Sequence, residues 1–513
     1  NIGKFGGDTD NWEWPRHTGD FSLFRVYADK DGNPAEYSPN NVPLKPKYHL
    51  TTSLKGFEEN DFAMILGYPG RTNRWMPAGG IQQNVEYAYP AWVEASKTSM
   101  DVMKKYMDKD QQVKLDYASS YASIANYWKN RQGMIDALTQ HKTAESKRNE
   151  EKAFQKWASK KGNDRFEEVI PVINNYYKNT NKASTHDNYL GLLLRTRMAT
   201  IPYRLGNAMD YYLQQNEAKQ AEVKPQLEAE INDLYEGIYM PLEKDVLAAQ
   251  LKLYSTKAEN IAPMVARIAT ANNKSEAGWN DYLNTAFENS IFQSKEKVEA
   301  FMANPDAEVL KNDPLFQLST DLLKRYRYES EEEKQLNNDF ERAYRLMVQG
   351  MREMNPDAKY YPDANSTLRL TYGKVIALPE DKRNDAVKNY YTTLKGTIAK
   401  YQPGDDEFDM PQKLIDLYEN KDFGQYADND GYLPVNFLTD NDITGGNSGS
   451  PVLNGKGELI GLAFDGNIEA MAGDVIFDDQ LQRTINVDIR YVLFLIDKFA
   501  GASHIIDELT IVK

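Results

Sequence analysis

Apolar residues change their spacing twice along this 513-residue chain, and that change limits what it can fold into more than any other feature. From about residue 84 to about residue 354 they recur every three, four or seven positions with Lys and Glu between them, as at Ile231, Leu234 and Ile238, which is typical of amphipathic helices. Short apolar runs bounded by Gly- and Pro-containing turns precede and follow this region, which is typical of strands. We therefore predict a mostly helical insertion of about 270 residues in a β protein.

Strands are expected in both flanking segments, wherever a short apolar run is bounded by turn residues. Before the helical region they are residues 21–27 and 62–66, and after it residues 368–370, 375–378, 437–438, 451–453 and 458–464. The turn at residues 454–457 joins the last two and predicts a β-hairpin. Residues 485–499 predict a strand that continues into a terminal helix.

Length and composition narrow the class of protein. At 58.7 kDa the chain is too long for one ordinary core, so we predict a β domain at residues 1–82, a helical domain at 83–365 and a second β domain at 366–513. A formal charge of −15 opposes binding to nucleic acid or to anionic lipid. No stretch approaches the roughly 18 consecutive apolar residues that a membrane span needs.

No cofactor and no metal are expected. The absence of cysteine excludes disulfides, thiol catalysis and Cys-ligated zinc, and the sequence has no phosphate-binding or dinucleotide-binding Gly motif. Residues 428–431 (DNDG) are similar to part of a calcium loop, but they lack the further carboxylate and the Glu of an EF-hand. We expect a plain turn there.

One Gly-rich motif points to catalysis. In the run TGGNSGSPV at residues 444–452, Gly446, Ser448 and Gly449 follow the Gly-x-Ser-Gly pattern with which chymotrypsin-like proteases present a nucleophile. The glycines allow the amides of Gly446 and Ser448 to point at one spot, where an oxyanion would develop. Such a stretch is otherwise a surface turn, but the strand before it and the hairpin after it favour the protease architecture. Ser448 is the candidate nucleophile.

A serine nucleophile also needs a base and a residue that orients the base. Asp20 is the best orienting residue because it directly precedes the predicted buried strand 21–27, although an Asp at such a place also caps turns. None of the five histidines fits the role of the base. His17 lies only three residues before Asp20, which would rarely let one ring reach both Asp20 and Ser448. The sequence as given therefore predicts no catalytic base.

Three longer stretches resemble a known family. Residues 7–22 (GDTDNWEWPRHTGDFS), 444–451 (TGGNSGSP) and 464–467 (FDGN) closely resemble the bacterial dipeptidyl-peptidase 7 and 11 family of chymotrypsin-clan serine exopeptidases. The resemblance implies an α+β fold: a chymotrypsin-like double β-barrel with a large inserted all-α domain. The first barrel is expected to be incomplete, because the family's catalytic His lies upstream of anything in this sequence.

The same resemblance implies roles and surroundings. Asp20 would be the triad Asp and Ser448 the nucleophile, with the Gly446 and Ser448 amides as the oxyanion hole. A homodimer and a periplasmic or cell-surface location in a Gram-negative bacterium are further implications of the family.

How a substrate would bind also follows from the resemblance. Asp465 resembles the family's amine-binding Asp, with Asn11 and Trp12 beside it, and Asn126 would hold the substrate backbone. An α-amino group is a cation at neutral pH and needs a carboxylate at a fixed distance from the nucleophile. Peptides with a free N-terminus would then present their second peptide bond to Ser448. Without the resemblance, Asp465 would be a turn residue and Asn126 a helix-surface amide.

Gly466 separates two branches of the family. The acid-specific branch carries an Arg directly after the Asp, which binds a P1 Asp or Glu, whereas Gly466 leaves space and no charge. The resemblance therefore implies release of dipeptides with an apolar P1 residue, through an acyl-enzyme. Three alternatives stay open: a non-catalytic peptide-binding or scaffold protein, an inactive fragment that lacks the base, and an ordinary endopeptidase.

Overall fold

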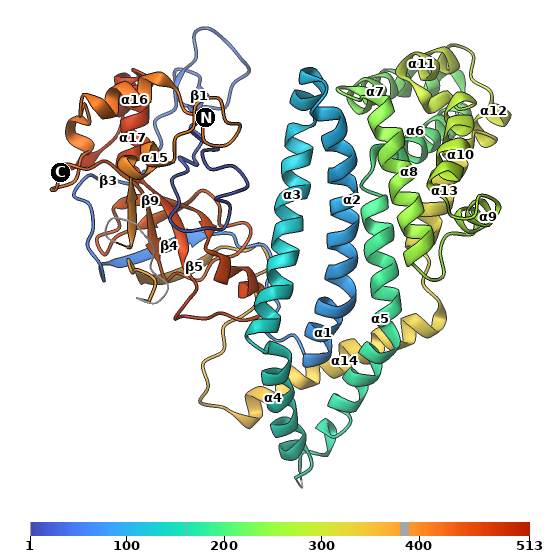
Figure 1. Cartoon of the computed structure of the whole chain (residues 1–513), viewed down its shortest axis with the longest axis horizontal. Coiled ribbons are helices and arrows are strands. Elements are labelled where there is room, and N and C mark those ends of the chain that lie inside the picture. The colour runs from blue at the N-terminus through green and yellow to red at the C-terminus, as the bar shows by residue number, and fades with distance from the viewer. Residues whose placement is uncertain (1, 161, 380–388) are drawn as a thin grey trace. The chain divides into compact units, whose positions relative to one another are not determined.

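The computed structural model describes residues 2–160, 162–379 and 389–513 and contains two compact units (Figure 1). One unit consists of Asn1–Trp75 together with Tyr360–Lys513 and holds the strands, and the other consists of Met76–Lys359 and is helical. The helical unit begins before the expected residue 83, because α1 (Ala78–Gln83) contains two glycines that weaken the helix signal in the sequence. No helix of the described residues is long and apolar enough to cross a membrane.

Helices of very different length form the helical unit (Figure 1). After α1 they are η1 (Asn84–Ala88), α2 (Tyr89–Met107), α3 (Gln111–Gln140), α4 (Thr143–Ala158), η2 (Asp164–Phe166), α5 (Val169–Leu193), α6 (Arg197–Leu213), α7 (Glu217–Tyr235), α8 (Met240–Lys257), α9 (Pro263–Ala271), α10 (Glu276–Glu288), η3 (Ile291–Gln293), α11 (Lys295–Ala303), α12 (Ala307–Lys311), α13 (Pro314–Arg327) and α14 (Glu331–Met354). Among the long ones are α2, α3, α5 and α14.

The apolar faces of these helices meet in shared cores. The largest core joins α2, α5, α6, α8 and α13, with Leu205 and Leu318 among its buried residues. Pro241 and Pro314 stand in the first turns of α8 and α13, where a missing N–H costs no helical hydrogen bond. A new helix therefore begins at each of these prolines.

The strands belong to the other unit. They are β1 (Tyr27–Ala28), β2 (Val42–Pro43), β3 (Thr52–Ser53), β4 (Phe62–Gly67), β5 (Arg369–Lys374), β6 (Tyr391–Thr393), β7 (Pro434–Thr439), β8 (Ser450–Leu453), β9 (Leu459–Gly466), β10 (Thr484–Asp488) and β11 (Ile511–Val512). One sheet has the order β5-β4-β8-β9-β10-β7-β6, with β3 beside β9 and β11 beside β3, and β1 and β2 form a separate pair. The described strands thus give a mixed α+β fold with an open sheet, and they do not show two closed barrels.

Short helices cover one core of this unit. They are α15 (Leu394–Lys400), α16 (Gln412–Glu419), η5 (Gly424–Tyr426), α17 (Ile489–Phe494), η7 (Leu495–Phe499) and α18 (Ser503–Ile506). Their apolar residues pack with Phe5 and with Val435 and Val487 of the sheet. The segment that precedes Asp20 is therefore anchored in the same core as β7 and β10.

Most of the strands predicted near the Gly-rich motif are confirmed. β8 and β9 form the predicted hairpin, with Val452 opposite Gly461, and residues 485–499 form β10 followed by α17 and η7. Residues 368–370 and 375–378 do not give two strands. β5 ends at Lys374, and Val375, whose N donates to Asp61 O at 2.8 Å, forms only an isolated bridge with Thr439 of β7.

Residues 21–27 do not form the predicted buried strand. Only Tyr27 and Ala28 are paired in a strand, with β2, and Leu23, Phe24 and Val26 are exposed, Phe24 at 86%, whereas Phe21 is partly buried. An apolar run shows that burial would be favourable, but a strand also needs a neighbouring backbone for its hydrogen bonds. Among the described strands none pairs with residues 21–26. The prediction that Asp20 precedes a buried strand is therefore wrong.

Candidate active site

Ser448 lies in the loop that enters β8, directly across from the end of β9. Ser450 pairs with Ala463 in the β8–β9 ladder, and Gly449 N donates to Ala463 O at 2.7 Å. This register brings Ser448 to Phe464, whose carbonyl oxygen accepts a hydrogen bond from Ser448 Oγ at 3.2 Å. Ser448 is exposed, so a substrate can reach its hydroxyl.

Close contacts and hydrogen bonds fix the backbone conformation of the loop before Ser448. Gly446 has a φ of +106°, and a Cβ at this position would lie 2.4 Å from the carbonyl oxygen of Tyr68, so a side chain does not fit. Asn447 is buried and closes the loop: its N donates to Thr444 O at 3.1 Å, and its Oδ1 accepts from Thr444 N at 3.2 Å. A loop fixed by its own backbone is what donors to an oxyanion require.

Asp465 follows Phe464 in β9 and is almost buried, with 11% of its side chain exposed. Its Oδ2 accepts from Arg16 Nη1 at 2.7 Å and from Trp12 N at 3.4 Å, and its Oδ1 accepts from Gly466 N at 2.9 Å. Burial raises the pKa of Asp465, and the Arg16 guanidinium acts in the opposite direction. The register of two strands thus holds a carboxylate one residue beyond the carbonyl that Ser448 contacts.

The N-terminal segment reaches this carboxylate because side chains of the sheet bind its backbone. Thr392 Oγ1 in β6 donates to Arg16 O at 2.6 Å, and Asn436 Nδ2 in β7 donates to Thr18 O at 3.0 Å. These hydrogen bonds fix the stretch that carries Trp12 and Arg16.

Asp20 ends this stretch and is exposed as a residue, although the protein desolvates its carboxylate in part. That desolvation raises the pKa of Asp20, the nearby Arg16 lowers it, and the Asp465 carboxylate raises it again. Asp20 and Asp465 therefore have Arg16 as a common neighbouring cation.

The histidines lie elsewhere. His17 is buried, and burial together with nearby Lys400 lowers its pKa to about 3, so the ring is neutral at neutral pH. Lys400 in turn pairs with Asp10 at 2.7 Å. All five histidines lie in the described ranges, and none of them hydrogen-bonds to Ser448 or Asp20.

The other predicted site residues divide between the two units. Asn11 and Trp12 are half-buried in the β unit, and Asn126 is an exposed residue of α3 in the helical unit. Gly466 is buried, and a Cβ there would lie 2.8 Å from Ala470 Cβ and 3.5 Å from Trp12 Cζ3. The expectation of open space at Gly466 is therefore wrong along the Cβ direction, because the turn after β9 brings Ala470 against it.

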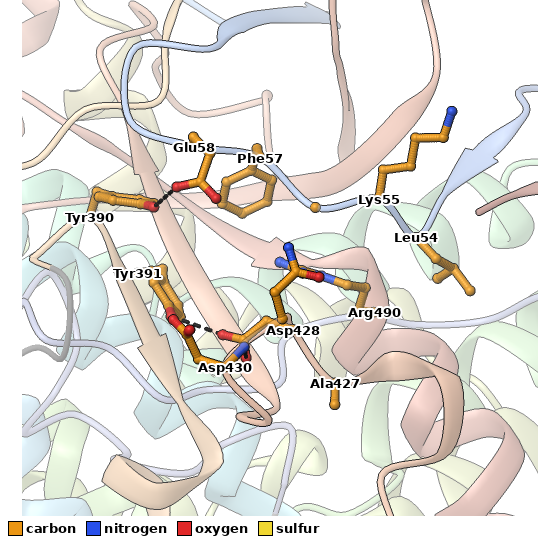
Figure 2. A pocket seen from close by; sticks show the side chains of 12 residues that line it. Leu54, Lys55, Phe57, Glu58, Tyr390, Tyr391, Ala427, Asp428, Asp430 and Arg490 are labelled. Atoms are coloured by element: carbon orange, nitrogen blue, oxygen red, sulfur yellow. Dashed lines mark hydrogen bonds between the residues drawn. The ribbon is translucent and has the colours of Figure 1, made fainter.

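A separate polar pocket lies in the β unit (Figure 2). It encloses about 60 Å³ and is lined by residues 54–58, 390–391 and 427–430 and by Arg490, none of them a predicted site residue. Asp428 accepts from Tyr391 Oη at 2.9 Å and from the backbone of Asp430 and Tyr432 at 3.0 and 2.8 Å. Residues 428–431 are thus a turn, as predicted, and no group of three metal-ligating side chains occurs in the described part of the chain.

An exposed serine in a fixed Gly-rich loop, in contact with the strand that carries a nearly buried carboxylate, is an arrangement suited to a peptidase. The model of the family Peptidase S46 matches residues 1–511. The chain belongs to the Peptidase S46 family, and the resemblance to dipeptidyl-peptidases 7 and 11 is confirmed. It is accordingly a peptidase, a hydrolase of peptide bonds.

Two relatives illustrate the two branches. Dipeptidyl-peptidase 7 of Capnocytophaga gingivalis is 56% identical over 518 residues, which span 100% of this chain and 72% of that protein. The Asp/Glu-specific dipeptidyl-peptidase of Flavobacterium psychrophilum is 37% identical over 531 residues, which span 100% of this chain and 71% of that protein.

Solved structures agree with the fold. Porphyromonas endodontalis DPP11 in complex with the dipeptide Arg-Glu matches with a TM-score of 0.88 at 35% identity, over 99% of this chain and 72% of that one. The same protein in complex with Arg-Asp also matches with a TM-score of 0.88, at 36% identity, over 100% of this chain and 73% of that one.

Sequence reasoning missed Arg16 and the carbonyl of Phe464. Arg16 stands inside the first of the three family-like stretches, but a sequence does not reveal that its partner is a carboxylate 449 positions away. The contact of Phe464 is a backbone contact, so its side chain carries no signal for it.

Gly446→Ala is predicted to distort the nucleophile loop, because its Cβ would meet a backbone oxygen and its φ is positive. Activity of the full-length protein should fall by two orders of magnitude or more, about the cost of losing one oxyanion donor. Gly445→Ala is the matched control, since no atom lies within 4 Å of its would-be Cβ and its φ is not positive. Equal rates of peptide hydrolysis in the two variants would contradict this account of the loop.

Proposed function

We propose that this chain is the catalytic part of a serine dipeptidyl-peptidase, which releases dipeptides from peptides with a free N-terminus through an acyl-enzyme. The observation that carries the proposal is the β8–β9 register, with Ser448 Oγ 3.2 Å from Phe464 O and the Asp465 carboxylate on the next residue. Dipeptidyl-peptidase names among the relatives support it.

In this mechanism the substrate ammonium group binds Asp465, and the chain of the peptide runs from there toward Ser448. Ser448 Oγ attacks the second carbonyl carbon, and the Gly446 and Ser448 amides stabilise the oxyanion. The general base that accepted the Ser448 proton gives it to the leaving amine as the C–N bond breaks, and water then hydrolyses the ester between Ser448 and the dipeptide with the same base taking the proton of the water. Asp20 is proposed to orient this base.

The amine role of Asp465 requires its carboxylate to be ionised, and the ion pair with Arg16 favours that form. An ionised carboxylate is needed to hold an ammonium group, so activity should be lost as pH falls through the Asp465 pKa, which burial raises. Arg16 opposes that shift. An ordinary endopeptidase has no use for a buried carboxylate one residue from the carbonyl that its nucleophile contacts.

Blocking the substrate amine is the direct test. In the full-length protein, N-acetylated peptides should be cleaved at least about tenfold less efficiently than free ones, because a lost charge-assisted contact costs roughly 2 to 5 kcal/mol. Asp465→Asn should lower kcat/KM for the free peptides toward the acetylated value. Its melting temperature must be followed in parallel, because the change leaves Arg16 without its partner. Equal cleavage of free and acetylated peptides would rule out the exopeptidase role.

An apolar P1 preference is the second part of the proposal. No cation stands at residue 466, and burying a P1 carboxylate without a cation costs several kcal/mol. Ala470 fills the space beside Gly466, so a larger residue at position 466 would have to displace Ala470.

Reporter dipeptides that differ only at P1 test this preference. The full-length protein should prefer Leu, Phe or Met over Asp and Glu. Gly466→Arg alone should be impaired on all reporters by the clash with Ala470, and Gly466→Arg combined with Ala470→Gly should gain activity on P1 Glu. Ala470→Gly is the control. A wild-type preference for Asp or Glu would refute the apolar assignment and leave Ser448 and Asp465 untouched.

Residues 1–513 on their own are proposed to be nearly inactive, because Ser448 donates to a carbonyl and has no histidine neighbour. An inactive isolated chain could still act as a non-catalytic peptide-binding protein. Purified residues 1–513 should show only the residual catalysis of an oxyanion hole, about 10³ to 10⁴ over water. Family-like turnover that Ser448→Ala abolishes would contradict the proposal and require a base among the described residues.

A further inference from the structure

We propose that Arg16 is a positioning residue of the amine site, which holds the Asp465 carboxylate in one orientation and leaves Oδ1 to accept the substrate ammonium group. The proposal rests on the dipeptidyl-peptidase function proposed above. It adds a residue that none of the predicted site roles includes.

Contacts on all sides fix Arg16 itself. Its side chain is 7% exposed, its Nε donates to Thr18 Oγ1 at 2.6 Å, and Thr18 Oγ1 donates onward to Phe5 O at 2.8 Å. The guanidinium carbon lies 5.3 Å from the centre of the Phe464 ring, within cation–π range. A planar cation held in this way presents Nη1 to the carboxylate in a set direction.

The two oxygens of Asp465 are used unequally. Oδ2 accepts from both Arg16 Nη1 and Trp12 N, whereas Oδ1 accepts only from Gly466 N among the described residues. A carboxylate oxygen has room for two donors, so Oδ1 keeps one position. Arg16 and the substrate amine therefore do not compete for the same oxygen.

The charges around the pair give Arg16 a second effect. Arg16 is the charged group that acts on Asp465, and Arg16 and Asp465 are the charged groups that act on Asp20, whereas Lys400 pairs with Asp10 and acts on His17. A buried carboxylate that loses its cation takes up a proton more readily. Without Arg16 nothing would offset the effect of burial on Asp465 as strongly, and a protonated Asp465 would not hold an ammonium group.

Binding of a product dipeptide tests the role of Arg16 at the amine site without the chemical step. An effect of the Arg16 substitution on Asp20, which is proposed to act in catalysis, therefore does not influence the result. Calorimetry of Val-Leu with the full-length protein between pH 5 and 7 stays below the range where the amine itself loses its proton, near pH 8. Arg16→Gln should bind Val-Leu about tenfold or more weakly at pH 6.5, and the acidic limb of its binding profile should lie at higher pH than in the wild type. Arg16→Lys, which keeps the charge, should recover part of the affinity.

Arg25→Gln is the matched control, because Arg25 pairs with Glu508 on the surface, and it should leave binding unchanged. Wild-type affinity, tighter binding or an unshifted pH profile in folded Arg16→Gln would overturn the proposal. Should Arg16→Gln not fold, Thr18→Val removes the hydroxyl that holds Nε and should weaken binding in the same direction. A wild-type protein that binds N-acetyl-Val-Leu as well as Val-Leu would instead refute the exopeptidase function.

Discussion

The antiparallel register of β8 and β9 is the constraint on which the site depends. Because Ser450 pairs with Ala463, the same register continued along both segments places Ser448 opposite Asp465, and Ser448 Oγ contacts the carbonyl of the preceding residue, Phe464. The spacing between Ser448 and Asp465, the proposed nucleophile and the proposed amine anchor, is thus set by the β8–β9 pairing together with the short loop that carries Ser448. Rigid strands hold such a distance more closely than loops do, and a fixed distance is what an enzyme needs to cut at one bond from the end of a chain.

Further hydrogen bonds hold the N-terminal segment, which carries Trp12 and Arg16, against Asp465. The segment that carries Trp12 and Arg16 has little regular structure, yet Thr392 and Asn436 of the sheet bind its backbone. Arg16 then joins Asp465 in a nearly buried ion pair. Removing one partner of such a pair leaves an uncompensated buried charge and destabilises the protein. The conformation of the N-terminal segment and that of β9 therefore depend on each other at the proposed amine site.

The parts of the fold that could be predicted from the sequence are those with local signals. Turn chemistry and periodicity predicted the hairpin around residues 454–457 and the transition from strand to helix at residues 485–499. The prediction of a buried strand at residues 21–27 was wrong because apolar side chains do not identify the neighbouring strand with which a segment would pair. The prediction of open space at Gly466 was wrong because the turn after β9 brings Ala470 against it, and the sequence does not show this contact. The Arg16–Asp465 pair joins residues 449 positions apart, and no local pattern announces it.

The central claim is that an amine held at Asp465 sets the cut at the second peptide bond. Mass spectrometry of the products from a hexapeptide with a free N-terminus and an apolar residue at positions two and four tests it most directly, with the full-length protein and short reaction times. The account predicts the N-terminal dipeptide and the matching tetrapeptide as the first products, followed by the second dipeptide. Single amino acids, tripeptides or internal cuts among the first products would contradict it.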